Sequence, residues 1–472
     1  MPRNECQGHA GRSLQTNGVD PKRARFLTSS CQIRKTWQHC NQPLSLAPMA
    51  TAYLPRQRLA LIGLICTLLA GCSQGRSSLP RVLRIAKSST DPGGLDVEAS
   101  VRDRRVVKDV QELLQDFDPG LRLHPTSYSE LNLVREIARQ TSSGLGPDLI
   151  ITNGNTALAL QEQGLTRPVP LTPEERSRIS TMALQRVTGA NGAIAGVPIG
   201  QYVQLACYDK RRLPKPPETL RALAQASGKG KVFGFALHLE DLYWTLGGFQ
   251  ATPALQAALN DEAASAQDKS RLSAWLNWLQ NASFQQNVLF LSNQVVLGEQ
   301  LIQGQLDWIT CWSSQLPKLR DALNEHLGVT ILPKGPMGQP SPITRLQVWA
   351  LGRNSSRRQR SDSLKLLGFM VEPWTQKTLA LNYRTSFPVN PQVAPIVQRQ
   401  LAFERNVTAE HLELGLSDKP STRHANAVLA AVSTNPQRMA DVNGVLSSVV
   451  FGTRTPKEAT SALQNTLRGE QP

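Results

Sequence analysis

The sequence predicts an α/β fold of two lobes with parallel strands. Apolar strand-like segments alternate with amphipathic helices from residue 81 onward, and a β-α-β-α-β order is typical of parallel sheets covered by helices. About 400 residues follow residue 71, more than a single hydrophobic core usually serves. No low-complexity linker divides this length. We therefore expect the chain to cross between the two lobes more than once.

Five consecutive segments predict the start of the first lobe. Arg81–Lys87 alternates apolar and polar residues as a strand does. Val106–Phe117 has apolar residues spaced as on one helix face. A second strand, LRLHPTSY, is followed by a helix, ELNLVREIARQTSSG, which we expect to end at Gly144. Gly146–Thr152 is nearly all apolar, as in a buried parallel strand.

The same alternation recurs, with interruptions, in the rest of the chain. GVPIGQYVQLACYD indicates an extended pair, and KVFGFALH, LDWITCW and GVTILP indicate single strands. RLSAWLNWLQNA and NQVVLGEQLIQGQ have helical spacing, and SLKLLGFMVEPWTQKTLAL is expected to form one long helix. A mostly helical tail closes the chain. These segments predict the second lobe and the segments that link it to the first.

An apolar run near the N-terminus, LIGLICTLLAGCSQG, ends in a cysteine. The stretch Leu59–Ala70 is too short to span a bilayer, which takes about 20 apolar residues. It has the length of a secretory signal core, and Arg56 and Arg58 precede it. The letters LAGC resemble the lipobox of bacterial lipoproteins, in which the signal is cut before a Cys that carries a diacylglycerol. The alternative is a buried core helix that happens to end in Gly-Cys.

The lipobox resemblance implies that the mature chain starts at Cys72 and is lipidated there. Export signals stand at the extreme N-terminus, and a start at Met49 would place this one correctly. We therefore expect residues 1–48 to be an unstructured extension, 49–71 a signal peptide and 72–80 a polar tether.

Composition excludes several function classes. Residues 1–71 hold nine Lys or Arg and two Asp or Glu, so the remaining chain keeps +9 of the total charge of +16. Nucleic-acid binders concentrate such charge beside aromatic platforms, whereas here only Arg353–Arg360 forms a short basic cluster, as a solvated loop before a helix does. The isolated His residues form no zinc pattern, and GKGKVFG indicates a turn before a strand. Beyond the lipobox only Cys207 and Cys311 remain, and the sequence leaves their pairing open.

An ordered set of landmarks resembles the extracellular solute-binding proteins of ABC importers, in the carbohydrate-type family 1 branch. GPDLIITNGNTALALQEQGLTRPVPL resembles that family's Pro-Asp strand with the loop and helix after it. GVPIGQYVQLACYDKRRLPKPPETL resembles its hinge strand and the helix start that follows. GVTILPKGPMG, NYRTSFPVN and GTRTPKEATSALQNTL resemble its Leu-Pro strand, the loop before its third crossing and its closing helix. The landmarks cover nearly all of residues 81–468.

The resemblance implies a two-lobed, periplasmic-binding-protein-like fold of type II with a hinge of crossing strands. Lobe 1 would hold residues 81–200 and 350–390, and lobe 2 residues 203–345 and 391–472. The lobes would close on a ligand by hinge motion. A lipid tether suits such a receptor, because tethering raises its effective concentration at the permease.

Four polar residues after strands are candidate ligand contacts in lobe 1. The resemblance implies that Ser88 and Ser89 face the cleft, and that Asn153 and Asn155 bind hydroxyl groups. Sugars are held by planar hydrogen bonding to hydroxyls and by aromatic faces against the ring, which suits Asn, Ser, Tyr and Trp. Asn-Gly-Asn also suits a turn, because these residues tolerate left-handed backbone. Both interpretations of the asparagines remain open.

Further candidates lie at the hinge and in lobe 2. Tyr202 is four residues past the hinge proline, where hinge packing is the alternative role. Asp241 and Trp244 occupy a helix start, and Trp244 also fits a core position. Trp312 follows a strand and looks like the family's cleft tryptophan. Rim contacts are expected at Arg345, at the second crossing, and at Tyr383 and Arg384, before the third. For Tyr383 and Arg384, hinge packing and surface charge are the favoured alternative.

Together these features predict a lipid-anchored substrate-binding component of an ABC importer, on the periplasmic side of the cytoplasmic membrane. Its ligand would be a neutral polar solute, a saccharide or a sugar-like osmolyte. We expect no cofactor, metal or nucleic-acid partner. No catalysis is expected, since neither a nucleophile with a base nor paired carboxylates can be recognised. The alternative is a non-transport lipoprotein with this fold and a degenerate cleft that acts through a protein partner.

Overall fold

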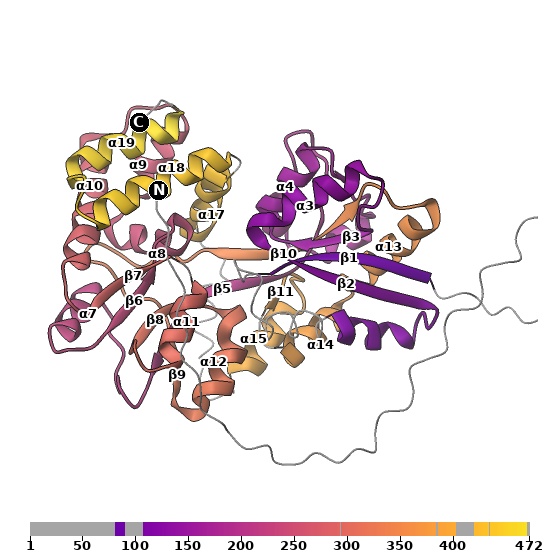
Figure 1. Cartoon of the computed structure of the whole chain (residues 1–472), viewed down its shortest axis with the longest axis horizontal. Coiled ribbons are helices and arrows are strands. Elements are labelled where there is room, and N and C mark those ends of the chain that lie inside the picture. The colour runs from indigo at the N-terminus through magenta and orange to yellow at the C-terminus, as the bar shows by residue number, and fades with distance from the viewer. Residues whose placement is uncertain are drawn as a thin grey trace, which may run out of the picture. The chain divides into compact units, whose positions relative to one another are not determined.

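The computed structural model describes residues 81–89, 107–292, 294–383, 386–402, 420–433 and 435–469. The predicted extension, signal peptide, lipidation site Cys72 and tether lie outside these residues. Residues Ser77–Pro472 form one compact unit. Its described strands follow the order β2-β1-β3-β10-β5-β8-β6-β7, with β4, β9 and β11 paired at the sides of this path (Figure 1).

The first sheet is built around the residues predicted for lobe 1. Its strands β2, β1 and β3 are parallel, and β10 pairs antiparallel with β3, because the chain returns to this sheet from lobe 2. Short strands β4 and β11 pair with β10 and β5. The strands of this sheet are β1 Arg81–Ser89, β2 Leu121–Ser129, β3 Leu149–Thr152, β4 Thr166–Arg167, β10 Thr344–Gly352 and β11 Phe387–Pro388, with the first half of β5 Val197–Asp209.

Helices cover both faces of the first sheet. Residues 107–115 are helical and share an apolar core with α13 and with the sheet residues Leu83 and Ile85. On the other face, Leu133 and Ile137 of α3 pack against Ala86 and Ile150. The helices of this part are α3 Glu130–Ser142, α4 Gly154–Glu162, α5 Pro173–Ser177, α6 Thr181–Gln185, α13 Arg357–Met370 and α14 Pro373–Tyr383.

Strand β5 belongs to both sheets. Its residues Val197–Val203 pair with β10 in the first sheet, and Gln204–Tyr208 pair with β8 in the second. Apart from Tyr202, its side chains are buried. One long buried strand therefore carries the chain from one sheet to the other (Figure 1).

The second sheet lies in lobe 2. Its strands β8, β6 and β7 are mutually parallel, and β8 and β9 run antiparallel to β5. This sheet comprises the second half of β5 with β6 Phe233–Ala236, β7 Val288–Leu291, β8 Trp308–Trp312 and β9 Leu327–Thr330.

Two apolar cores flank the second sheet. The larger one joins β6 and β8 to α8–α10 and α17–α19, and the smaller joins β5 and β9 to α11, α12 and α15. The helices are α7 Leu220–Ser227, α8 Leu239–Phe249, α9 Thr252–Leu259, α10 Ala266–Ser283, α11 Gln294–Ile302, α12 Leu316–Leu323, α15 Ala394–Ala402, α17 Pro420–Ser433, α18 Pro436–Val450 and α19 Pro456–Arg468. Two 3-10 turns, η2 Ser313–Gln315 and η3 Asn324–His326, flank α12.

The predicted α/β alternation is confirmed, with two corrections. The expected extended pair GVPIGQYVQLACYD is the single strand β5. The expected long helix is two helices, α13 and α14, because Pro373 lacks an amide donor and starts a new helix. The expected end at Gly144 holds: α3 ends at Ser142, and Gly144 adopts a φ of 76°.

No helix among the described residues is long and apolar enough to cross a membrane.

Candidate functional site

The two lobes are joined where strands β5 and β10 cross between them. Tyr202 and Arg345 are cross-strand neighbours there, and Thr344 faces Val203. The third crossing, β11, passes on the other side of β5, where Phe387 pairs with Gln201. Gly200 lacks a side chain at this point, and a Cβ there would lie 3.2 Å from the carbonyl oxygen of Phe387. Three crossing segments therefore meet within a few residues.

Arg345 reaches from the crossing to the first turn of α8. Its Nε and Nη2 donate to the two carboxylate oxygens of Glu240, each over 2.7 Å. A two-point pair of this kind is both stronger and more directional than a single contact. The side chain of Arg345 keeps 25% of its area exposed and that of Glu240 33%. The pair thus presents a planar array of charged groups partly to solvent.

Trp312 lies beneath this pair. It ends the fully buried strand β8, and the Arg345 guanidinium lies 4.5 Å from the centroid of its ring. Trp312 itself is only 2% exposed. In this arrangement the indole supports Arg345 through a cation–π contact, rather than offering its face to solvent.

Asp241 anchors the edge of the same indole. Its Oδ1 accepts hydrogen bonds from Trp312 Nε1 (2.9 Å) and from Gln294 Nε2 (3.2 Å). Gln294 also donates to Thr310 Oγ1 over 3.0 Å. Gln204 of β5 donates to the backbone carbonyls of both Glu240 and Asp241 (3.2 Å each) and so fixes the start of α8 to the crossing.

The two carboxyl groups have opposite pKa shifts. Burial raises the pKa of Asp241, and the neighbouring Glu240 adds to this, against the charge of Arg345. Burial acts to raise the pKa of Glu240 too, but the charge and hydrogen bonds of Arg345 outweigh it and leave the pKa lowered. Glu240 is therefore held as the charged partner of Arg345.

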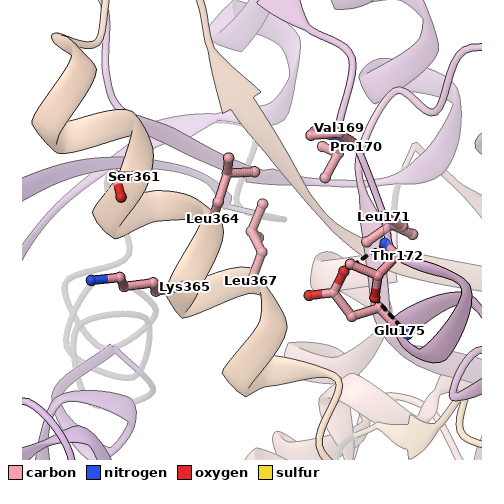
Figure 2. Close-up of a pocket in the computed structure, with 9 residues that line it drawn as sticks. All are labelled: Val169, Pro170, Leu171, Thr172, Glu175, Ser361, Leu364, Lys365 and Leu367. Atoms are coloured by element: carbon pink, nitrogen blue, oxygen red, sulfur yellow. Dashed lines mark hydrogen bonds between the residues drawn. The ribbon is translucent and has the colours of Figure 1, made fainter.

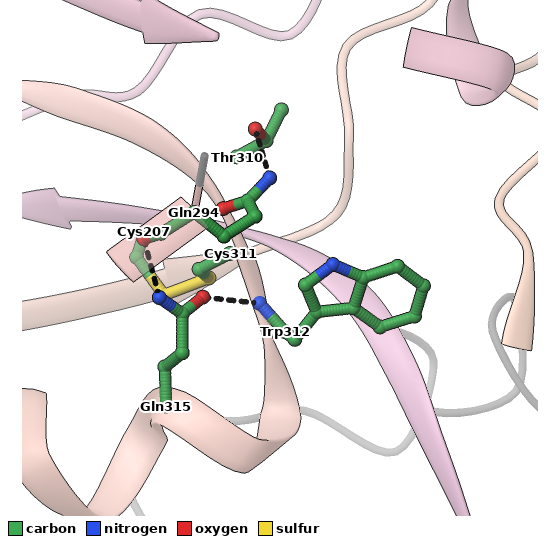
Figure 3. The surroundings of a disulfide bond; sticks show 6 residues. All are labelled: Cys207, Gln294, Thr310, Cys311, Trp312 and Gln315. Carbon is green, nitrogen blue, oxygen red and sulfur yellow. Dashed lines mark hydrogen bonds between the residues drawn. A yellow bond between two sulfur atoms is a disulfide. The ribbon is translucent and has the colours of Figure 1, made fainter. Parts of the chain in front are cut away.

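A disulfide fixes the end of β8, next to Trp312, to the crossing strand β5. Cys207 of β5 and Cys311 of β8 are bonded, with their Cα atoms 5.8 Å apart. Figure 3 shows this bond beside Trp312, whose backbone N–H donates to Gln315 Oε1 over 2.9 Å, while Gln315 Nε2 donates to the Gln294 carbonyl over 2.7 Å. The pairing that the sequence left open is thus formed next to the candidate site.

A second set of polar side chains, centred on the partly buried Arg186, links lobe 1 to the crossing. Arg186, which follows α6, donates to Thr344 through its Nη1 (to Oγ1, 2.7 Å) and its Nη2 (to the carbonyl). Asn426 of α17 accepts from the Thr344 N–H at 3.2 Å. Desolvation lowers the pKa of Arg186 to about 10, although the charge of Glu240 opposes this. The group stays protonated at neutral pH and adds positive charge beside Glu240.

The asparagines of lobe 1 lie at the start of α4. Asn153 caps this helix, its Oδ1 accepting from the Thr156 N–H at 2.8 Å. Asn155 lies in the first turn. Between them, a Cβ on Gly154 would lie 3.4 Å from the Arg186 carbonyl oxygen and 3.7 Å from Leu346 Cδ1. The start of α4 is therefore adjacent to Arg186 and to the strand residue after Arg345.

The remaining predicted contacts fall in three different settings. Ser88 and Ser89 end β1 and pair in register with Tyr128 and Ser129 of β2. Trp244 is fully buried in lobe 2 and stacks on Phe235, which fits its core interpretation. Tyr383 is the last residue of α14. The side chain of Tyr383 and the whole of Arg384 are outside the described part.

The structure thus brings together Tyr202, Asp241, Trp312 and Arg345 of the predicted set. The sequence analysis missed four of their partners: Glu240, Gln204, Gln294 and Arg186. Glu240 had a usable signal, since it adjoins Asp241 at a helix start where acidic residues are favoured. Gln204 is a single polar residue inside an apolar strand, whereas Gln294 and Arg186 stand beside other polar residues. Only their tertiary contacts identify these three.

A separate pocket of about 340 Å³ lies in lobe 1, between the segment before α5 and helix α13 (Figure 2). Its carboxylate, Glu175, is engaged in the capping box of α5 with Thr172. The lining contains none of the predicted contacts: Val169, Pro170, Leu171, Thr172, Glu175, Ser361, Leu364, Lys365 and Leu367. We assign no ligand to it. Within the described residues no group of His, Cys, Asp and Glu could hold a metal ion.

The comparisons with known proteins identify the fold. No protein-family model matches the sequence, and no curated protein matches it. Solved structures do. An ABC transporter solute-binding protein from Thermotoga lettingae, bound with α-D-tagatose, superposes with a TM-score of 0.61 at 14% identity, covering 82% of this chain and 99% of that one.

Two further structures agree. The GacH receptor of Streptomyces glaucescens, solved with acarbose, has a TM-score of 0.59 at 13% identity and covers 84% of this chain and 100% of its own. MalX of Streptococcus pneumoniae, in complex with maltopentaose, has a TM-score of 0.60 at 16% identity, covering 82% and 99%. The predicted resemblance to carbohydrate-type solute-binding proteins is confirmed at the level of the fold, which is the two-lobed one of these receptors.

Proposed function

We propose that this protein is a receptor for a polar solute, a saccharide or a sugar-like osmolyte, bound at the crossing of β5 and β10. The observation that carries the proposal is the Arg345–Glu240 pair. It combines donors and acceptors in one partly exposed plane, and sugar hydroxyls pair with such groups as acceptors and donors at once. The solved structures of similar fold were determined with tagatose, acarbose and maltopentaose, which supports this ligand class.

In this proposal the residues have distinct roles. Arg345, Glu240 and Tyr202 touch the ligand, while Trp312 and Asp241 position Arg345. Asn153, Asn155, Ser88 and Ser89 contribute from lobe 1. Lobe 1 (81–200 and 350–390) and lobe 2 (203–345 and 391–472) close around the ligand by hinge motion at β5 and β10. The mechanism is capture and delivery to an ABC permease, without catalysis.

The cellular setting is proposed from the sequence alone. Cys72 carries the lipid anchor after removal of residues 49–71, and the mature chain lies on the periplasmic side of the cytoplasmic membrane. The test is metabolic labelling with a radioactive fatty acid in cells that make the wild type or Cys72→Ser. We expect label and membrane association in the wild type only. Label that persists in Cys72→Ser would contradict the anchor.

Ligand binding is tested by isothermal titration calorimetry with D-tagatose, maltose, maltotriose, glycine betaine and L-arginine as probes. We expect saturable heat with a saccharide or the osmolyte and none with arginine. Binding of arginine alone would overturn the ligand class.

A second candidate function is supported by a specific observation. Asp241, Trp244 and Trp312 are all buried among the protein's own side chains, as expected of a cleft that has lost its solute. The chain would then be a non-transport lipoprotein that acts through a protein partner. Absence of heat with every probe, from a protein that unfolds cooperatively, would favour this candidate.

A further inference from the structure

Three aromatic side chains pack on one another at the surface of lobe 1. Phe117 follows the 107–115 helix, Phe369 lies near the end of α13, and Trp374 is in the first turn of α14. The Phe117 ring centroid lies 5.4 Å from that of Phe369 and 5.5 Å from that of Trp374, and Phe369 and Trp374 are 5.4 Å apart. We call these three residues the aromatic patch.

Two residues of the aromatic patch are open to solvent, and the third, Phe369, is partly buried against the core of lobe 1. Phe117 is 63% exposed and Trp374 41%, whereas five other tryptophans are almost fully buried. Packing of the three rings on one another pre-orders them without covering them. Contiguous exposed apolar groups of this kind mark interaction sites, and Trp with Phe is the pair that membrane-surface segments place at the headgroup level.

The start of β1 lies beside the aromatic patch. β1 begins at Arg81, whose backbone N–H donates to the Gly120 carbonyl over 2.8 Å. The Arg81 guanidinium forms ion pairs with Asp118, the neighbour of Phe117, and with Asp362 of α13. Arg81 thus joins the two segments that carry Phe117 and Phe369.

Chain length limits how far this end of lobe 1 can stand from a membrane. Nine peptide units separate Cys72 from Arg81, and fully extended they span at most about 32 Å. A lipid on Cys72 therefore keeps the start of β1, and with it the aromatic patch, close to the bilayer surface. Such a tether imposes a high effective concentration, so even a weak contact with the bilayer is formed much of the time.

Charges around the aromatic patch are mixed. Arg81 is neutralised by Asp118 and Asp362. Arg122, which donates to the Pro119 carbonyl at 3.0 Å, and the exposed Asp116 are of opposite charge. A contact formed here would depend on the aromatic side chains, not on attraction to anionic lipid.

From these observations, and resting on the proposed lipid anchor, we propose that the aromatic patch docks on the lipid bilayer surface. The partner is the headgroup and upper acyl region of the membrane that holds Cys72. Docking orients lobe 1 relative to the membrane, so the lipid and the aromatic patch form a two-point attachment.

The test uses the full-length lipoprotein, reconstituted in vesicles of phosphatidylethanolamine and phosphatidylglycerol with a brominated phosphatidylcholine. Bromine quenches tryptophan only near contact, and Trp374 is the exposed tryptophan of the described residues. We expect quenching in the wild type, loss of quenching in Trp374→Phe, which keeps an aromatic ring, and reduced quenching in Phe117→Ser. Phe451→Ser is the matched control, because Phe451 is also exposed but follows α18 in lobe 2. The tryptophan fluorescence of this variant should be quenched as much as that of the wild type.

Flotation of the vesicles separates the two proposals. Wild-type protein that floats but shows no bromine quenching, or Trp374→Phe that is quenched equally, overturns the docking while leaving the anchor intact. Wild-type protein that does not float overturns the anchor, and the docking with it. Raising the salt concentration should leave the quenching unchanged, and its loss in salt would contradict a contact made by aromatic side chains.

Discussion

The guanidinium of Arg345 lies 4.5 Å above the centre of the Trp312 ring while two of its nitrogens donate to Glu240. One side chain of the crossing strand β10 thereby engages both the end of β8 and the start of α8. A cation–π contact contributes about 0.5–2 kcal/mol, depending on desolvation. The orientation of the Arg345–Glu240 pair therefore depends on the indole beneath it.

Replacement of Arg345 is expected to weaken ligand binding far more than folding. Arg345→Ala should lower the affinity for the bound saccharide by tenfold or more, because a charged hydrogen bond contributes about 1.5–3 kcal/mol. Arg345→Lys should recover little, since lysine cannot make a two-point contact. Titration calorimetry measures both. The control is Arg221→Ala on α7, an exposed arginine, which should bind normally; equal loss in the control would contradict the assignment.

Asp241 gives the stability a specific dependence on pH. Its pKa in the folded state is raised above the ordinary 3.8, so the folded protein holds this proton more tightly than the unfolded chain. The stabilising contribution is present below pH 3.8 and is lost as the pH rises through the raised value. Asp241→Asn removes this loss. Its melting temperature relative to the wild type should therefore increase as the pH is raised from about 4.

Glu240 acts in the opposite direction. Its pKa is lowered in the folded state, so its contribution is present above the ordinary value and is lost as the pH falls through the lowered one. In Glu240→Gln the melting temperature should fall less than in the wild type as the pH is lowered. Thermal melts of the wild type and both variants across pH 3–7 separate the two groups, and parallel curves for all three would contradict these assignments.

The Cys207–Cys311 bond is expected to stabilise the lobe 2 sheet strongly. The two residues are 104 apart in sequence, and closing a loop of that size contributes about 4–5 kcal/mol in a chain-entropy model. The double variant Cys207→Ala/Cys311→Ala should lose most of this in urea unfolding. Reductant should not act on the native wild type, because both cysteines are buried. Rapid reduction without denaturant would show that the region opens.

Asn153 can be assigned by a pair of substitutions. Asn153→Ser keeps a capping oxygen and removes the amide, whereas Asn153→Ala removes both, at a cost of about 1 kcal/mol in stability. If Asn153 also binds the ligand, both variants should lose affinity, and only the alanine variant should lose stability. Unchanged ligand affinity in Asn153→Ser would show that Asn153 acts only as a helix cap.

Local patterns were enough to predict the lobe 1 elements. Alternation at Arg81–Lys87 and helical spacing at Val106–Phe117 correspond to β1 and to the 107–115 helix. Two element boundaries were wrong for opposite reasons. β5 continues as one strand because it pairs with β10 and then with β8, which no local signal reveals. Pro373 does carry a local signal, and it should have divided the helix at that position.

The candidate site was predictable only in part. Arg345 and Asp241 were named from their places in the order of landmarks, but Glu240 became identifiable only through its pairing with Arg345. Trp312 was expected to be a cleft tryptophan, whereas the structure buries its ring under Arg345. Such roles follow from which side chains lie above and below one another, and sequence spacing does not encode that across lobes.

The most direct test of the account is a thermal-shift comparison of the wild type and Glu240→Gln, with maltose, maltotriose, D-tagatose and glycine betaine as probes. A ligand at a hundredfold excess over its Kd stabilises the native state by about 2.7 kcal/mol. We predict that at least one probe raises the wild-type melting temperature and that Glu240→Gln fails to respond to the same probe. An equal response in both proteins would contradict the site, and no response in the wild type would contradict its role as a receptor for these solutes.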